Sequence, residues 1–145
     1  SYKNSYMRIG RNFKSGLDEK LLKTILNLKD NNIDVKKLSE AFNKSKWLSK
    51  DNTTAIVASS KFGWLINNET IIIDSLVSKL LKVKGNNYEE YCNKWQSIYV
   101  IAEPKIKKVI AEYFNHKEFK IMKDKWFRMR VFDQYLWTYS SKLNS

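Results

Sequence analysis

Residues 48–81 read LSKDNTTAIVASSKFGWLINNETIIIDSLVSKLL, and this stretch decides the fold. It holds two helix-like segments, separated by a short link over residues 70–73. Three of the four link residues are isoleucine, so the link is too apolar for a solvated loop and we expect it to be buried. Asp74 follows at once, and a buried link would fix the direction of its carboxylate.

Both flanking segments have the features of helices. The first can be capped by Ser49 or Asp51, and its small residues would let another helix approach closely. Asp74 is a suitable N-cap for the second, whose apolar residues recur at helical spacing. Gly85 suits a left-handed C-terminal cap.

The remaining chain also shows helical periodicity. Before the central stretch, helices are expected over about 17–29 and after Asp34. After it, helices are expected behind an Asn86–Glu89 capping pair, from Pro104 and over about 124–142. Proline suits the first turn of a helix. The predicted fold is all-α, an orthogonal bundle of about six or seven helices. It forms one domain over residues 1–145, with residues 1–14 as a basic, aromatic N-terminal arm.

The composition is strongly basic. Lysine and arginine number 27 against 15 acidic residues, which gives a net charge of +12. This excess favours an acidic partner, and nucleic acid is the commonest one. A composition rich in lysine and asparagine, as in an AT-rich genome, would give the same excess without such a partner, because lysine is spread along the whole chain.

Other sites are excluded by residues that are scarce. The single cysteine, Cys92, excludes an internal disulfide and a multi-cysteine zinc site, and the single histidine, His116, leaves no histidine-based metal cluster. We expect no metal and no cofactor. No apolar run approaches about 18 residues, and no signal peptide is visible, so we expect no membrane association and a reducing, intracellular (cytoplasmic) location.

The order of these parts resembles the helix-hairpin-helix DNA glycosylase superfamily. In this comparison residues 48–54 stand at the hairpin, and residues 71–74 (IIID) stand at the apolar link and the catalytic acid. Residues 130–137 (RVFDQYLW) are similar to the final helix of small proteins that share this helical core. The resemblance implies a helix-hairpin-helix core, a DNA partner and a catalytic role for Asp74.

The chain also departs from the superfamily pattern. It lacks the hairpin glycines that let backbone amides approach a phosphate. The lysine nucleophile of the bifunctional members has no counterpart, because Ile56 stands at that place and Lys61 is more than one turn further on. It has no cysteine cluster for an iron–sulfur site. A Schiff-base lyase is therefore disfavoured, whereas a monofunctional glycosylase needs only the carboxylate and a base pocket.

Three sets of residues are candidates for function, and each has a structural alternative. Asp74 could stabilise an oxocarbenium-like sugar or activate water, but an N-cap role alone explains an aspartate there. A DNA phosphate could be held at the start of the first segment by Lys50, Asn52, Thr53 and Lys61, but a solvated, capped helix start also explains these residues. Aromatic rings alternate with the basic residues Lys123, Lys125, Arg128 and Arg130. That pattern suits stacking on single strands. Alternatively, the rings belong to the core and the basic residues form a solvated surface.

We therefore expect a nucleic-acid-binding domain, with DNA as the first choice, and leave catalysis open. One alternative is a monofunctional DNA glycosylase that uses Asp74, which requires a pocket beside that residue lined by side chains such as Trp64, Tyr135 or Trp137. The other is a protein-interaction or accessory module without catalysis, which would show an exposed aromatic patch. A nucleic-acid binder requires its basic residues to gather on one face.

Overall fold

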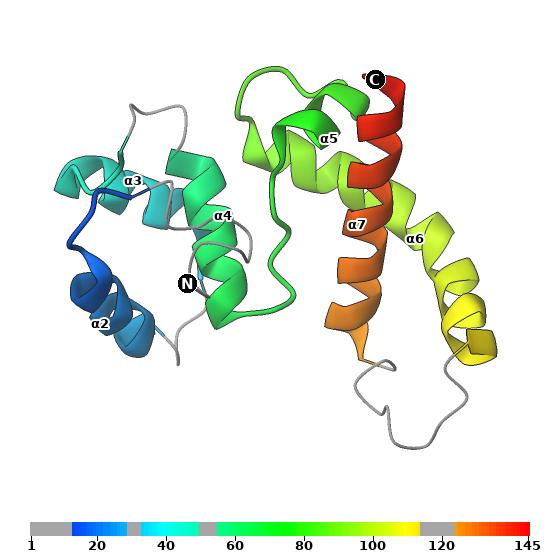
Figure 1. Ribbon diagram of the computed structural model, residues 1–145, viewed down its shortest axis with the longest axis horizontal. Helices are drawn as coiled ribbons and strands as arrows, with labels where there is room; N and C mark the ends of the chain where they lie inside the picture. Colours follow the sequence, from blue (N-terminus) through cyan, green and yellow to red (C-terminus); the bar gives the residue numbers. More distant parts are fainter. Residues whose placement is uncertain (1–12, 29–32, 50–54, 114–123) are drawn as a thin grey trace. The chain divides into compact units, whose positions relative to one another are not determined.

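The computed structural model describes residues 13–28, 33–49, 55–113 and 124–145 (Figure 1). These residues contain no strand, which confirms the predicted all-α class. The helices are α2 (Asp18–Leu28), α3 (Val35–Ser45), α4 (Ala55–Ile66), α5 (Ser75–Leu80), α6 (Tyr88–Tyr113) and α7 (Lys125–Leu143). None of these described helices is both long and apolar enough to cross a bilayer.

Contacts along the chain divide it into two compact units, Ser1–Ile73 and Asp74–Ser145. The boundary falls directly after the third isoleucine of the link, so the link belongs to the first unit and Asp74 begins the second. The prediction of one domain over residues 1–145 stays a prediction.

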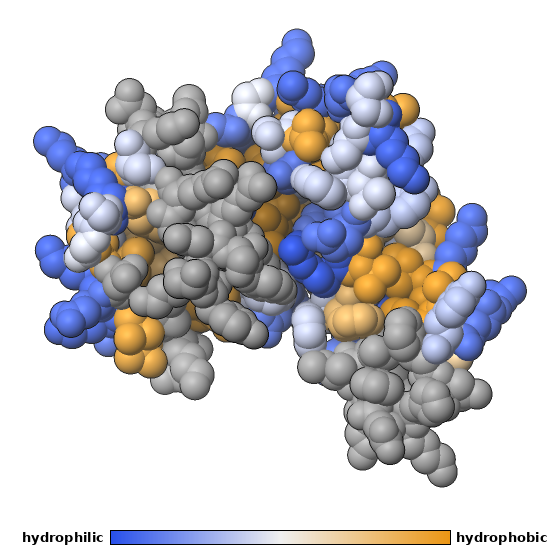
Figure 2. Space-filling model, viewed as in Figure 1, coloured by the Kyte–Doolittle hydropathy of each residue, from blue (hydrophilic) through white to orange (hydrophobic). Residues whose placement is uncertain are grey.

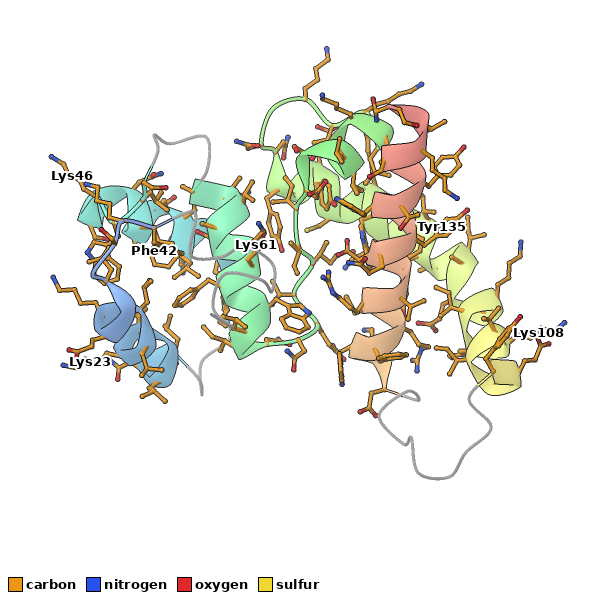
Figure 3. All side chains as sticks on the ribbon, viewed as in Figure 1. Lys23, Phe42, Lys46, Lys61, Lys108 and Tyr135 are labelled. Atoms are coloured by element: carbon orange, nitrogen blue, oxygen red, sulfur yellow. The ribbon has the colours of Figure 1, made fainter. Side chains whose placement is uncertain are left out.

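The first unit packs α2 and α3 against α4 around phenylalanine rings. The ring of Phe42 meets Phe13 edge-on at 5.0 Å and Phe62 edge-on at 5.3 Å between centroids. Figure 3 shows Phe42 directed between the helices. Phe13 is buried and forms a bridge to Leu48, so the last apolar residue of the predicted N-terminal arm joins the core. Residues 1–12 of that arm lie outside the described residues.

Helix α4 is buried on more than one side. Ala55, Ala58, Ser59 and Ser60 are all fully buried. A Cβ at Gly63 would lie 3.2 Å from the Thr70 methyl group, so the glycine allows the chain leading into the link to pass close to the helix.

The apolar link is buried, as predicted. Ile71, Ile72 and Ile73 are each less than 9% exposed and lie in neither a helix nor a strand. The backbone N–H of Ile73 donates to the Ser60 hydroxyl at 3.2 Å, and this bond ties the end of the link to α4.

The second unit consists of α5, α6 and α7. Figure 1 shows α7 crossing α6, and α5 packs on α7. The rings of Trp95 and Tyr99 stack at 5.1 Å, and Phe132 meets Trp95 edge-on at 4.9 Å. Tyr139 follows Phe132 and Leu136 at helical spacing, which predicts a buried position, but it is exposed. Ser140 takes the buried position because it is small and its hydroxyl can bond to a backbone oxygen within the helix.

The structure corrects two predicted helix boundaries. Pro104 does not begin a new helix, since α6 runs unbroken from Tyr88 to Tyr113 with the proline inside it. Helix α6 begins at Tyr88, and the Asn87 side chain accepts the Glu90 N–H at 3.1 Å, one residue further on than the predicted Asn86–Glu89 pair.

The end of α5 also differs in detail from the prediction. The helix stops at Leu80, and Lys82 already adopts a left-handed backbone with φ of 54°. Gly85 is left-handed as well, with φ of 62°, so two residues with positive φ turn the chain before α6.

Candidate functional site

Asp74 is the N-cap of α5. Its Oδ1 accepts the backbone N–H of Leu76 at 2.8 Å and that of Val77 at 3.2 Å, and its backbone is extended, as a cap requires. The capping interpretation is therefore confirmed. Both bonds use the same oxygen and fix the orientation of a half-buried carboxylate.

A second carboxylate, Asp133 on α7, lies close to Asp74. Burial, supported by the charge of Asp74, raises the pKa of Asp133 to about 6, although the nearby Arg130 charge acts in the opposite direction. The Arg130 guanidinium donates to Asp133 Oδ2 at 2.6 Å. Asp133 therefore titrates far closer to neutrality than an exposed aspartate.

Two buried side chains of α6 complete this group. Neither the Tyr91 hydroxyl nor the Trp95 Nε1 makes a well-formed hydrogen bond within the described residues. The Tyr91 hydroxyl nevertheless lies close to the Asp74 backbone, and the Trp95 indole lies close enough to Asp133 to favour its charged form. Burial, followed by the charges of Asp133 and Asp74, raises the pKa of Tyr91 above its ordinary value, so its hydroxyl keeps its proton. Buried polar atoms that are poorly satisfied are rare and often mark a functional or strained place. We name Asp74, Tyr91, Trp95, Arg130 and Asp133 the carboxylate cluster.

The carboxylate cluster can hold or move a proton. Neighbouring carboxyl groups whose surroundings push their pKa values apart can serve as an acid and a base. The sequence prediction found Asp74 but missed Asp133. The sequence does contain a signal for Asp133. Arg130 and Asp133 lie three residues apart on a predicted helix, a spacing that allows an ion pair, and the apolar Phe132 beside them indicates that the pair would be partly buried.

The two predicted arginines on α7 are largely held inside the second unit. Arg128 Nε lies 3.7 Å from Glu103 Oε2, and Arg130 pairs with Asp133. Their side chains are only 14% and 22% exposed. Lys125, the third described member of this predicted set, is exposed at the start of α7.

The predicted nucleic-acid-binding residues belong to both units of the chain. Lys61 is half-buried on α4 of the first unit, whereas Lys125, Arg128 and Arg130 belong to the second. Lys50, Asn52, Thr53 and Lys123 lie outside the described residues.

Several rings on α7 are exposed. Tyr135 and Tyr139 are 63% and 46% exposed, and their rings lie nearly parallel with centroids 6.3 Å apart. Figure 3 shows Tyr135 on α7. Trp137 is also exposed. Helical spacing places Tyr135, Tyr139 and Lys142 along one stripe of the helix.

Tyr135 also lines a pocket of about 480 Å³ between α6 and α7. Asp74 does not line this pocket, and the pocket wall is mostly apolar. It therefore differs from the pocket beside Asp74 that a glycosylase would require.

Comparison of the chain with protein-family models, with curated proteins and with solved structures gave no match. The resemblance to helix-hairpin-helix glycosylases stays a prediction.

Proposed function

We propose that the chain binds nucleic acid, with DNA as the first choice, through exposed aromatic rings and lysines of its second unit. One observation carries this proposal. The parallel Tyr135–Tyr139 pair is exposed on a helix that also presents Lys125 and Lys142 to solvent. Aromatic side chains beside positive charge are the usual means of binding single strands, because every base can stack on a ring.

The positive charge supports a polyanionic partner but does not select one face. The chain carries +12, and exposed lysines occur on both units, for example Lys23 and Lys46 in the first and Lys108 in the second (Figure 3). Such a distribution gives affinity that is mainly electrostatic and falls steeply with salt. The rings of α7 would then determine where a strand lies.

The rings are tested by the double variant Tyr135→Ala/Tyr139→Ala. Fluorescence anisotropy with labelled single-stranded DNA should show affinity reduced by about tenfold or more, since stacking contributes roughly 1–3 kcal/mol per base. Leu143→Ala, an exposed apolar residue of the same helix, is the matched control and should leave affinity unchanged. Equal losses in both variants, or none in either, would contradict a stacking role.

The lysines are tested by the salt dependence of the same binding. Replacing Lys125 and Lys142 with glutamine should weaken binding and reduce the salt slope by about one for each phosphate that a lysine no longer neutralises. The matched control is Lys23→Gln/Lys46→Gln in the first unit, which removes the same charge. If the control lowers the slope as much as the α7 variant, the strand does not follow α7.

A second candidate function, hydrolysis at the carboxylate cluster, is favoured by the pKa of Asp133. A carboxyl group with a pKa of about 6 beside Asp74 is what acid–base chemistry at neutral pH requires. Incubation with lesion-bearing duplexes tests the monofunctional glycosylase. Base release that is lost in Asp74→Asn and kept in Asp34→Asn, the cap of α3, would support it, whereas full turnover by Asp74→Asn would exclude Asp74 as the catalytic acid.

A further inference from the structure

The pocket between α6 and α7 is a groove with an apolar lining. Figure 2 shows hydrophobic residues, in orange, gathered over this part of the second unit with hydrophilic side chains at the border. Ile101 is 74% exposed, and Ile98, Val109 and Val131 are exposed as well. The groove is lined by Ile98, Ile101, Ala102, Lys105, Ile106, Val109, Ile110, Val131, Phe132 and Tyr135.

We propose that this groove binds an acidic amphipathic helix of a partner protein. The lining residues of α6 recur at intervals of three and four from Ile98 to Ile110, which is about 18 Å along the helix axis at ~1.5 Å per residue. A groove between two helices with this spacing accepts the apolar ridge of a third helix. About three turns of a partner helix would cover it.

The charge of the groove selects the partner. Among the described residues that line it, Lys105 is the one that carries a charge. Lys108 follows one turn later and points outward at the end of α6 (Figure 3), and Glu112 is the next acid in that direction. From Glu103 to Glu112, α6 carries three lysines against two acids, and Glu103 is paired with Lys107. The local balance is therefore positive and the whole chain carries +12, so an acidic helix gains electrostatic attraction in addition to apolar burial.

The same charge argues against two other occupants. A second copy of this chain would bring +12 toward +12, and this repulsion opposes self-association through the groove. Nucleic acid has the right charge, but its bases bind flat rings and polar groups, whereas most of the groove lining is isoleucine, valine and alanine.

The test uses the full chain and a designed peptide of about 14 residues, long enough to cover the groove. The peptide has leucine at helical spacing and glutamate elsewhere, and a counterpart carries lysine in place of glutamate. Fluorescence anisotropy should show that the acidic peptide binds and that the basic counterpart binds at least about tenfold more weakly. Absence of binding by the acidic peptide, or equal binding of both peptides, would overturn the proposal.

Two matched variants locate the binding. Ile101→Glu places a negative charge in the groove, and Val100→Glu places the same charge on the neighbouring residue, which is 71% exposed and does not line the groove. Ile101→Glu should weaken acidic-peptide binding at least about tenfold, whereas Val100→Glu should change it far less. Equal effects of the two variants would overturn the proposal.

Circular dichroism and thermal unfolding of both variants check that the helices are retained. If Ile101→Glu unfolds the chain, Ile101→Ser provides the same comparison without the charge.

The other occupants give different results in the same experiments. Sedimentation that shows a dimer lost in Ile101→Glu and kept in Val100→Glu would assign the groove to a second copy. Loss of single-stranded DNA binding with that pattern would assign it to nucleic acid. Either result overturns the acidic-helix proposal. Tyr135 lines the groove and also belongs to the tyrosine pair, whereas Tyr139 does not line the groove, so Tyr139→Ala tests DNA stacking without altering the groove lining.

Discussion

The two units of the chain build their cores from rings but treat polar atoms differently. In the first unit, Phe42 meets Phe13 and Phe62 edge to face, and rings without polar atoms fill the centre. In the second, the buried rings include Tyr91 and Trp95, whose polar atoms make no well-formed hydrogen bond in the described part of the chain. Buried polar atoms cost stability unless they are paired. Among the described residues, the first core leaves Ser59 Oγ without a well-formed hydrogen bond, whereas the second leaves the polar atoms of Tyr91, Trp95 and Tyr99 so, and the second core therefore bears more of this cost.

The two capping aspartates show the same contrast. Asp34 accepts the N–H groups of Lys36 and Lys37 at the start of α3, and Asp74 makes the equivalent bonds at the start of α5. Asp34 is exposed, whereas Asp74 is half-buried near Asp133. The capping geometry is local, but the surroundings that can give a carboxylate a chemical role come from packing.

The largest expected effect concerns the phenylalanine core. Phe42→Ala should destabilise the first unit by about 3–5 kcal/mol, because it removes a buried ring and leaves a cavity. Urea unfolding followed by circular dichroism measures the change. Leu26→Ala, an exposed apolar residue of α2, is the control and should change stability by less than about 0.5 kcal/mol.

The next effect concerns Asp133. Its folded-state pKa of about 6 lies above the ordinary value of 3.8, so the folded chain binds more protons than the unfolded chain between these pH values. Stability should therefore fall by roughly 2–3 kcal/mol as pH rises through that window, at about 1.36 kcal/mol per pKa unit.

Asp133→Asn removes this titration, and urea unfolding at pH 4 and pH 7 should show a pH dependence reduced by that amount. Asp124→Asn, an exposed acid of the same unit, should keep the pH dependence of the unchanged chain. If Asp133→Asn leaves the pH dependence of stability unaltered, the pKa of the Asp133 carboxyl group is not raised in the folded chain.

A smaller effect distinguishes the two caps. Asp74→Ala and Asp34→Ala should each cost about 1 kcal/mol of stability through the lost cap. Asp74→Asn keeps a capping oxygen, but it also removes a negative charge near Asp133 and should lower the pKa of Asp133. NMR titration of the carboxyl groups measures this shift, and Asp34→Asn should not produce it. A shift of equal size in both variants would remove the distinction between the caps.

The smallest effect concerns an exposed ion pair on α6. Lys94 Nζ lies 2.7 Å from Glu90 Oε1, and both side chains are about one-third exposed or more. Glu90→Gln should cost about 0.3–0.5 kcal/mol at low salt, and this difference should vanish in concentrated salt because solvent and ions screen the pair. If Glu90→Gln costs as much stability as breaking the Arg130–Asp133 pair, solvent exposure does not determine how much an ion pair contributes in this chain.

The sequence alone predicted the helical class, the burial of residues 71–73 and the capping role of Asp74. Each rests on local chemistry. Apolar spacing indicates helices, three consecutive isoleucines disfavour exposure to water, and an aspartate before a helix has N–H groups within reach. The misplaced helix start at Pro104 has the same origin, because local rules could not show that α6 continues through the proline.

Tertiary structure decided which chemistry the side chains meet. The proximity of Asp133 to Asp74, the pairing of Arg128 and Arg130 with acids, and the exposure of Tyr139 instead of Ser140 all depend on how α7 packs against α5 and α6. Periodicity shows that α7 has a buried face but not what lies opposite each position. A pKa, an ion pair or an exposed groove depends on neighbours far away in the sequence, and only the packed chain brings them together.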